Sequence, residues 1–400
     1  MTNYTFLDQK RASKKRLLYI DNLRIFLTIL VIIHHLIVGY GGASGRWYYN
    51  DPGQIDGFSW YVMTFFWLLN QSFFMGFLFM LSSYFSPGSY KRKGANVYIK
   101  ERLIRLGIPL CIYIIVVNPI LAYVAWIQKA GFEGSFWQFL PQYIKFYNGL
   151  DVGVLWFVEV LLIFSFAYVL WQWLSKYKII KSWKICVSTR VMNRPSNAQI
   201  FWVALGLGIL VFADRMLFVE NKFLQLLGLP NGHFIQYVVL LSIGMLAYQY
   251  NWFSELTKMQ GKIWTGVALG LLLVLPGILI AAGIMDGNFS PYSAGGGWDW
   301  RSLLAFSIWE QFMCVAIIIS LLVWCREKLN FQTNLTKTMA SNTYAVYVVH
   351  TPVLTLLIFA LRNVMLESVI KCILVTPIAI AFCFLVGHIV RQLPFAKQIL

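Results

Sequence analysis

A small set of ionisable side chains interrupts otherwise apolar segments of this sequence. The set comprises Arg24, His34, His35, Glu159, Glu310, His350, Lys371 and His388. A charge at the depth of a bilayer is costly unless it is paired or hydrated, so each residue is a candidate functional group. Lys371 and His388 lie nearer the ends of their segments, where snorkelling toward the interface is the usual explanation. The other six residues are those from which a site inside a membrane could be built.

Arg24 and His35 are 11 residues apart. Eleven residues of α-helix make about three full turns plus 20°, so we expect both side chains on one helix face, about 16 Å apart along the axis. This places Arg24 in the inner half of the membrane and His35 in the outer half. His34 is rotated by about 100° from His35, so only one of the two should face a given cavity, and the shared face favours His35. Alternatively, Arg24 pairs with Asp21 and snorkels inward, while His35 bonds a neighbouring helix.

Two carboxylates and a third histidine could join this site. Glu159 lies a few residues into an inward-running segment, at a depth like that of His35, and a carboxylate beside an imidazole raises its basicity and selects a tautomer. His350 precedes Thr351-Pro352 near mid-membrane, and Glu310 is also near mid-depth, so either could line the same cavity. The alternative for Glu159 is a structural ion pair or hydrogen bond, and for the other two it is packing.

Two further segments could bind substrate. Arg102-x-x-Arg105 places two guanidinium groups on one helix face at the cytoplasmic mouth, where they would bind phosphates well, although cytoplasmic loops are basic without any ligand. The loop at 286–301 combines glycines with aromatic rings that could stack on a sugar-like acceptor. These rings are Tyr292, Trp298 and Trp300. An interfacial aromatic belt is the simpler alternative for this loop.

Membrane-spanning helices must position these residues. Of the 400 residues, 59% are hydrophobic and 12% are charged, against about 45–50% and 25% in soluble domains. Stretches of about 20 apolar residues, each long enough to cross a bilayer, recur along the chain. We expect spans with cores at 17–39, 60–85, 106–127, 154–174, 199–219, 234–250, 263–285, 303–324, 343–361 and 368–390. The predicted fold class is an all-α integral membrane protein, a polytopic bundle of about ten transmembrane helices.

The net charge of +17 is explained by its distribution along the chain rather than by nucleic-acid binding. If the N-terminus is cytoplasmic, 24 Lys and Arg residues lie in inner segments and seven in outer loops. The seven are Arg46, Lys129, Lys145, Arg215, Lys222, Arg301 and Arg362. This bias fits the positive-inside rule, so we expect both termini on the cytoplasmic side of a plasma or bacterial inner membrane. The six cysteines form no CxxC pair, so neither a disulfide framework nor a metal site is indicated.

A single membrane domain is expected over residues 17–391, between a basic cytoplasmic tail at 1–16 and a short cytoplasmic tail at 392–400. No gap between spans is long enough for a second folded unit, so no soluble catalytic module is expected. We find no internal repeat, which counts mildly against a transporter built from duplicated halves.

Six segments together resemble a known family. They are RLLYIDNLRIFLTILVIIHHL at 16–36, FFMGFLFMLSSYFSP at 73–87, ERLIRLGIPL at 101–110, LWFVEVLLIFS at 155–165, SIWEQFMC at 307–314 and YAVYVVHTPVL at 344–354. In this order along ten spans they are similar to the membrane-bound acyltransferase type three family, in which an Arg in the first span is followed eleven residues later by a catalytic His. Arg24 and His35 fit that pattern.

The resemblance implies transfer of an acyl group, commonly acetyl, from cytoplasmic acyl-CoA to a hydroxyl of an extracytoplasmic or membrane-linked glycan or lipid. His35 would be the catalytic base or acyl carrier, and Arg24 would help hold the donor. Arg102 and Arg105 would face the phosphates of coenzyme A. Some relatives carry an additional hydrolase-like domain, for which this sequence offers no candidate, so the membrane domain is expected to complete the reaction alone.

Two rival functions stay open at this point. A transporter or flippase would use the buried charges to bind substrate or to relay protons, and it would move substrate into sealed vesicles without acyl-CoA. A sensor or scaffold would tolerate replacement of Arg24, His35 and Glu159. Loss of acyl transfer in His35→Ala would favour the enzyme over both.

Overall fold

The computed structural model describes residues 17–42, 47–53, 55–146, 151–175, 194–217, 232–283 and 298–400. Within these ranges the chain forms helices joined by short connections and contains no strand. The segments outside the described residues include the expected basic tail at 1–16, residues 176–193, and most of the aromatic loop at 286–301, with Tyr292. The predicted all-α membrane fold is confirmed.

The described part of the chain holds nine helical spans that are long and apolar enough to cross a membrane. They are α2 (Leu18–Gly39), α3 (Gly57–Tyr84), the continuous rod Ser86–Ala130, Gly153–Leu174 with α8 (Trp156–Leu174), α10 (Asn197–Leu217), α14 (Lys258–Ala281), α15 (Trp300–Lys328), α16 (Asn334–Ala360) and α17 (Ser368–Gln392). Three shorter helices are α7 (Phe136–Phe146), α13 (Trp252–Glu255) and α18 (Ala396–Ile399). The sixth expected span is α12 (Phe234–Tyr250), which is apolar but only 17 residues long.

The third span departs most from expectation, because its helix begins about 20 residues earlier than the predicted core at 106–127. Its parts are α4 (Ser86–Arg102), the π-turn Leu103–Gly107, α5 (Ile108–Ile112), the π-turn Tyr113–Val117 and α6 (Asn118–Ala130). Pro109 and Pro119 lie just after the two π-turns. Proline has no N–H and clashes with the carbonyl four residues earlier, so the regular hydrogen bond cannot form there and the helix widens locally.

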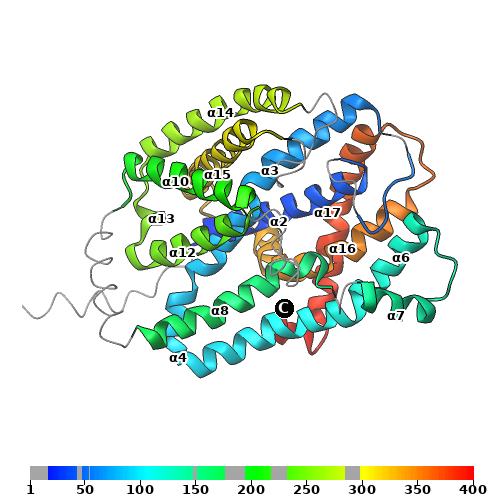
Figure 1. The fold of residues 1–400 in the computed structure, drawn as a ribbon. Helices are drawn as coiled ribbons and strands as arrows, with labels where there is room; N and C mark the ends of the chain where they lie inside the picture. Colours follow the sequence, from blue (N-terminus) through cyan, green and yellow to red (C-terminus); the bar gives the residue numbers. More distant parts are fainter. Residues whose placement is uncertain are drawn as a thin grey trace, which may run out of the picture.

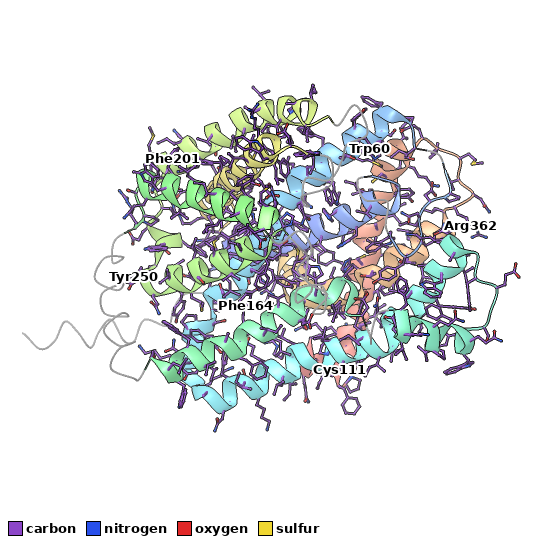
Figure 2. All side chains as sticks on the ribbon, viewed as in Figure 1. Trp60, Cys111, Phe164, Phe201, Tyr250 and Arg362 are labelled. Atoms are coloured by element: carbon purple, nitrogen blue, oxygen red, sulfur yellow. The ribbon has the colours of Figure 1, made fainter. Side chains whose placement is uncertain are left out.

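The first span, α2, lies in the middle of the bundle (Figure 1) and packs against α3, α15, α16 and α17. Of its most apolar 18 residues 67% are buried, against 17% for α14, which lies at the edge. Figure 2 shows side chains filling the space between the helices, while residues such as Phe201 project from the outside of α10. A helix enclosed in this way turns its polar residues toward internal cavities rather than toward lipid.

Lys371, expected to snorkel toward the interface, is buried instead. Its Nζ lies 2.6 Å from Asp51 Oδ1, and both side chains are almost fully buried. The Asp51 N–H also donates to the carbonyl of Gly39 at the end of α2. The ion pair therefore fixes residues 47–53, which carry Trp47 and Tyr48, over the C-terminal end of α2.

Candidate active site

Two cavities lie at opposite ends of α2. The outer cavity, of about 770 Å³, is lined by His34 and His35 in the last two turns of the helix. The inner cavity, of about 340 Å³, is lined by Arg24 and Thr28 closer to its start. Arg24 and His35 lie about 16 Å apart along the helix axis, so this stretch of α2 runs from one cavity to the other.

The inner cavity is strongly basic. Its cationic lining residues are Arg24, Arg92, Lys93, Arg102 and Arg105. Glu101 also lines it and is paired with Lys93. Arg24 Nη2 donates to Thr343 Oγ1 at 3.2 Å, and Arg24 Nη1 lies 4.0 Å from Asp21 Oδ1, so the ion pair with Asp21 that was the alternative interpretation is present but long. The remaining positive charge suits an anionic ligand such as a phosphate.

Arg105 is placed by the first π-turn. Pro109 has no N–H to donate to the carbonyl of Arg105, four residues earlier. Tyr344 of α16 fills this vacancy, because its hydroxyl donates to the Arg105 carbonyl at 2.7 Å. The proline therefore determines both the helix distortion and the contact that ties Arg105 to α16.

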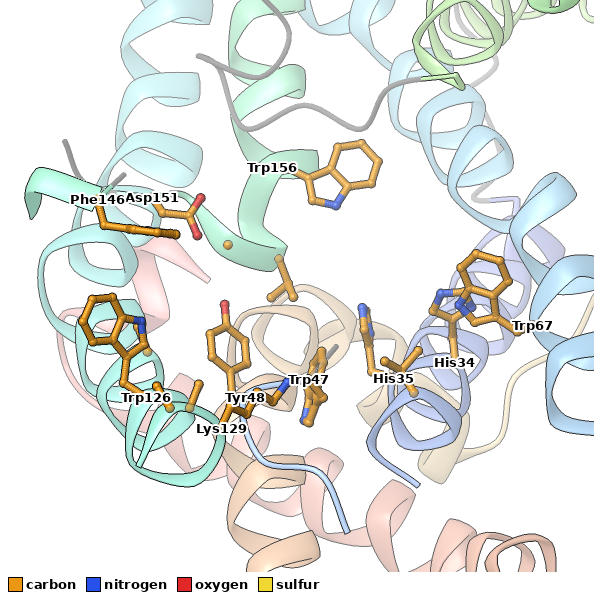
Figure 3. A pocket seen from close by; sticks show the side chains of 16 residues that line it. His34, His35, Trp47, Tyr48, Trp67, Trp126, Lys129, Phe146, Asp151 and Trp156 are labelled. Atoms are coloured by element: carbon orange, nitrogen blue, oxygen red, sulfur yellow. The ribbon is translucent and has the colours of Figure 1, made fainter. Parts of the chain in front are cut away.

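The outer cavity is lined mainly by aromatic rings (Figure 3). The rings are those of Trp47, Tyr48, Trp67, Trp126, Phe146 and Trp156. Lys129 and Asp151 add one group of each charge. Apolar walls with a few polar groups are typical of small-molecule sites, and aromatic faces give a large contact area at low entropic cost.

A polar network supports the far wall of the outer cavity and was missed by sequence reasoning. Asn118, at the start of α6, accepts a hydrogen bond from the Tyr48 hydroxyl at 2.5 Å and donates to Tyr143 and to the Asp151 carbonyl. Burial raises the pKa of Tyr48 well above its usual value, so its hydroxyl stays protonated and donates. The signal in the sequence was the polar Asn118-Pro119 pair within an apolar segment.

His35 is held by His350, which the sequence named only as possible cavity lining. His350 Nδ1 lies 2.6 Å from the Tyr347 carbonyl, so this nitrogen carries the proton and Nε2 has a lone pair. His35 Nδ1 lies 3.0 Å from the Val31 carbonyl and 3.2 Å from His350 Nε2. Because both neighbours are acceptors, His35 Nδ1 carries its proton, and the Nε2 lone pair is left for chemistry.

His34, which the sequence offered as a possible cavity-lining residue, does line the outer cavity, but the expectation that only one of the two histidines would face it is wrong. Its ring stacks between Trp67 and Phe74, at centroid distances of 5.5 and 4.8 Å, and its Nδ1 lies 3.2 Å from Asn70 Nδ2. The cavity extends across the C-terminal end of α2 and is wide enough to contact side chains 100° apart.

A thin layer separates the two cavities. Tyr347 lines the inner cavity, and its hydroxyl donates at 2.7 Å to the carbonyl of Val154, which lines the outer one. Its ring lies 5.4 Å from that of Phe157 and 5.5 Å from that of His350. A substrate that reaches from the inner cavity to His35 must therefore displace or pass Tyr347.

Glu159 lines neither cavity, and its Oε2 is buried without a hydrogen-bond partner among the described residues. The expected contact with His35 is therefore not seen, and His350 occupies that role instead. The depth of Glu159 was inferred from its position along the helix, but depth does not determine the direction in which the side chain points around the helix axis. Glu159 is two residues, about 200° of helix rotation, from Phe157, whose ring faces the inner cavity.

Glu310 was expected as possible cavity lining and instead belongs to a closed ionic cluster. Its Oε2 lies 2.7 Å from Arg215 Nη2, its Oε1 lies 3.1 Å from His233 Nε2, and the carboxylate and guanidinium are fully buried. Arg215, expected in an outer loop, also donates to Ser307 and to the Gly232 carbonyl. Glu310 lacks a nearby cation in sequence, so only the tertiary structure reveals these partners.

Among the described residues, no group of three or more His, Cys, Asp or Glu side chains could hold a metal ion.

The described end of the aromatic loop lies outside the outer cavity: Trp298 packs against Phe306, and Trp300 is exposed.

Known proteins resemble this chain over most of its length. Residues 17–388 match the sequence profile of acyltransferase family 3, described as an acyltransferase domain. The chain is 24% identical over 346 residues to glucans biosynthesis protein C of Escherichia coli strain K12, covering 84% of this chain and 81% of that protein. The same protein from strains K12 / DH10B and K12 / MC4100 / BW2952 matches equally. No solved structure matches.

The matched region begins at the start of α2 and ends near the end of α17, so it includes both cavities and the layer between them. The chain therefore belongs to acyltransferase family 3 and is a multi-pass membrane acyltransferase.

Proposed function

We propose that the protein transfers an acyl group, commonly acetyl, from cytoplasmic acyl-CoA to a hydroxyl of a glycan or lipid on the other side of the membrane. The observation that carries this proposal is the pair of cavities on α2: a basic cavity at Arg24 and a histidine-bearing cavity at His35. The positive-inside rule supports an orientation in which the basic cavity faces the cytoplasm.

The inner cavity suits the phosphates of coenzyme A. Arg24 of α2 lines this cavity together with Arg102 and Arg105 of the third span, and guanidinium groups bind phosphate oxygens in a bidentate manner. The long, flexible pantetheine arm would then follow α2 past Tyr347 and bring the thioester to His35. The bilayer contributes lipids around the bundle, and no metal is required for this chemistry.

A thioester is already activated, so the protein has to align the substrates, supply a base and stabilise an oxyanion. In the proposed reaction, His35 Nε2 takes the proton of the acceptor hydroxyl while the hydroxyl oxygen attacks the thioester carbonyl carbon. The C–S bond then breaks, and the coenzyme A thiolate takes the proton from the imidazolium. A two-step route, in which Nε2 first accepts the acyl group, begins from the same lone pair.

The aromatic lining of the outer cavity supports a carbohydrate acceptor. Trp126, Trp156 and Trp47 offer ring faces, and Asp151 and Lys129 offer polar groups at the edge. The name of the E. coli relative refers to glucan biosynthesis, which also supports a glycan. A hydroxyl attached to a lipid carrier is chemically equivalent at His35.

The test is release of free coenzyme A from acetyl-CoA by the purified protein, with a crude envelope extract as acceptor. Wild type is compared with His35→Ala and with His388→Ala, a matched control because His388 lines neither cavity. Release by wild type and by the control, and its loss in His35→Ala, supports the proposal.

Release that persists in well-folded His35→Ala would contradict the assigned role of His35. No release by folded wild type with several acyl donors, together with substrate uptake into sealed vesicles, would replace the enzyme by a transporter.

A further inference from the structure

We propose that His34 is a second catalytic residue, which donates a hydrogen bond from Nε2 to the oxyanion that forms on the thioester carbonyl. This inference rests on the proposed acyl transfer at His35. It follows from the opposite hydrogen-bonding environments of two neighbouring histidines in one cavity.

The proton of His34 is assigned by Asn70. The Asn70 side-chain amide faces the Leu30 carbonyl at 3.4 Å and His34 Nδ1 at 3.2 Å. An amide group next to a carbonyl must present its N–H₂ there, so the same nitrogen donates its second hydrogen to His34 Nδ1. Nδ1 is therefore the acceptor, and the neutral ring carries its proton on Nε2.

His35 has the reverse arrangement. Two acceptors, the Val31 carbonyl and His350 Nε2, surround its Nδ1 and keep the proton there. One histidine thus offers a lone pair from Nε2, and the next offers an N–H from Nε2. A base and a donor are the two groups that acyl transfer from a thioester requires.

Both Nε2 atoms are available to a substrate. His34 is 6% exposed and lines the outer cavity, and its Nε2 has no hydrogen-bond partner among the described residues. The rings of His34 and His35 meet edge to face at a centroid distance of 5.3 Å, and both line the outer cavity; Figure 3 shows them next to each other, with His34 against Trp67. An unpaired N–H in a buried site is unfavourable unless a ligand accepts from it.

The position of His34 is rigid, as an oxyanion donor requires. Its ring is held between Trp67 and Phe74, and Asn70 fixes its rotation from α3. A preorganised donor costs no reorganisation when charge develops on the thioester oxygen. In the reaction, the carbonyl π electrons move to the oxygen as the acceptor attacks, His34 stabilises that charge, and the electrons return as the C–S bond breaks.

The experiment compares two nearly isosteric variants. His34→Gln places an amide N–H₂ near the position of Nε2, whereas His34→Asn keeps a polar group beside Asn70 and has nothing at the Nε2 position. With acetyl-CoA varied and envelope extract fixed, we expect His34→Asn to lose about 10²–10³ in kcat with little change in KM. His34→Gln should keep activity within about tenfold of wild type.

Asn70→Asp supplies an independent measurement that leaves His34 in place. A carboxylate beside Nδ1 demands a donor and also raises the basicity of the ring, so the assay is run at a pH at which His34 stays neutral. The His34 proton then moves from Nε2 to Nδ1, and the N–H leaves the cavity. We expect a loss of kcat similar to that of His34→Asn in protein that remains folded. Full activity of a folded Asn70→Asp protein would overturn the tautomer assignment and with it the proposal.

Three other results would also overturn it. His34→Asn retaining kcat within about threefold while His35→Ala is inactive would leave the proposed function standing without a role for His34. Equal inactivity of folded Gln and Asn variants would show that ring shape, and not the donor, is required. Activity in both His34→Asn and His35→Ala would instead contradict the assigned role of His35, on which the role of His34 depends.

Discussion

Replacing His350 with leucine should weaken catalysis modestly rather than abolish it. The His35 Nδ1–H faces two acceptors, the Val31 carbonyl at 3.0 Å and His350 Nε2 at 3.2 Å. His350→Leu removes one of them, and the backbone carbonyl of Val31 stays. One neutral hydrogen bond contributes about 0.5–1.5 kcal/mol, which corresponds to about a 2- to 10-fold loss in the correctly oriented His35 tautomer.

The measurement is kcat and KM for acetyl-CoA in the coenzyme A release assay, for His350→Leu beside His350→Gln. The glutamine carbonyl oxygen can accept from His35 in place of Nε2, so this variant should recover much of the loss, and KM should be unchanged in both. If folded His350→Leu is as inactive as His35→Ala, His350 handles a proton of the reaction itself. If it matches wild type, the histidine pair does not orient His35. Either result refutes the reasoning.

Three substitutions test the inner cavity and the buried charges. Arg102→Gln should raise KM for acetyl-CoA about tenfold with little change in kcat, because one charge-assisted contact to phosphate is lost at the hydrated opening of the inner cavity. The increase in KM should be smaller at high salt, which screens this contact. Pro109→Ala restores an N–H to the helix and turns the residues before it, among them Arg105, by up to about 100° about the helix axis. It should therefore raise the KM for acetyl-CoA without removing a charge. The control Pro276→Ala in α14 should leave this KM unchanged. Glu310→Leu removes the carboxylate that faces the buried Arg215 and should lower unfolding stability by about 3–5 kcal/mol, and adding Arg215→Met should recover most of this loss.

The membrane fold could be predicted from the sequence because each span needs only length and hydropathy. The first span was expected at 17–39 and is Leu18–Gly39, since basic residues precede it and glycines follow. The third span could not be placed as well. Its helix continues from Ser86 through a polar, basic stretch that carries no apolar signal, and it is held there by contacts with α8 and α12.

The candidate site could be predicted along helix axes but not between helices. The spacing of Arg24 and His35 gives their separation within one helix, and each lines a cavity at its own end of α2. Pairing between helices depends on rotation about each axis, which apolar spans without a strong amphipathic pattern do not encode. For this reason Glu159 was expected beside His35, while His350 occupies that place, and the partners of Glu310 were not foreseen.

The distribution of charge within the bundle explains why two neutral histidines suit this reaction. The buried charges of Arg215 and Lys371 are each matched by a carboxylate, at 2.7 and 2.6 Å, so neither leaves an isolated charge in a medium of low dielectric constant. The reaction must nevertheless create charge at the end of α2, because the base becomes an imidazolium and the thioester oxygen becomes an anion. With His35 as base and His34 as donor, the imidazolium forms on His35 and the anion forms on the thioester oxygen beside His34 at the same step, and the attraction between these two charges offsets the loss of hydration. A permanent cation or carboxylate in place of either histidine would carry its charge before substrate binds, so the neutral pair gives selective stabilisation of the transition state.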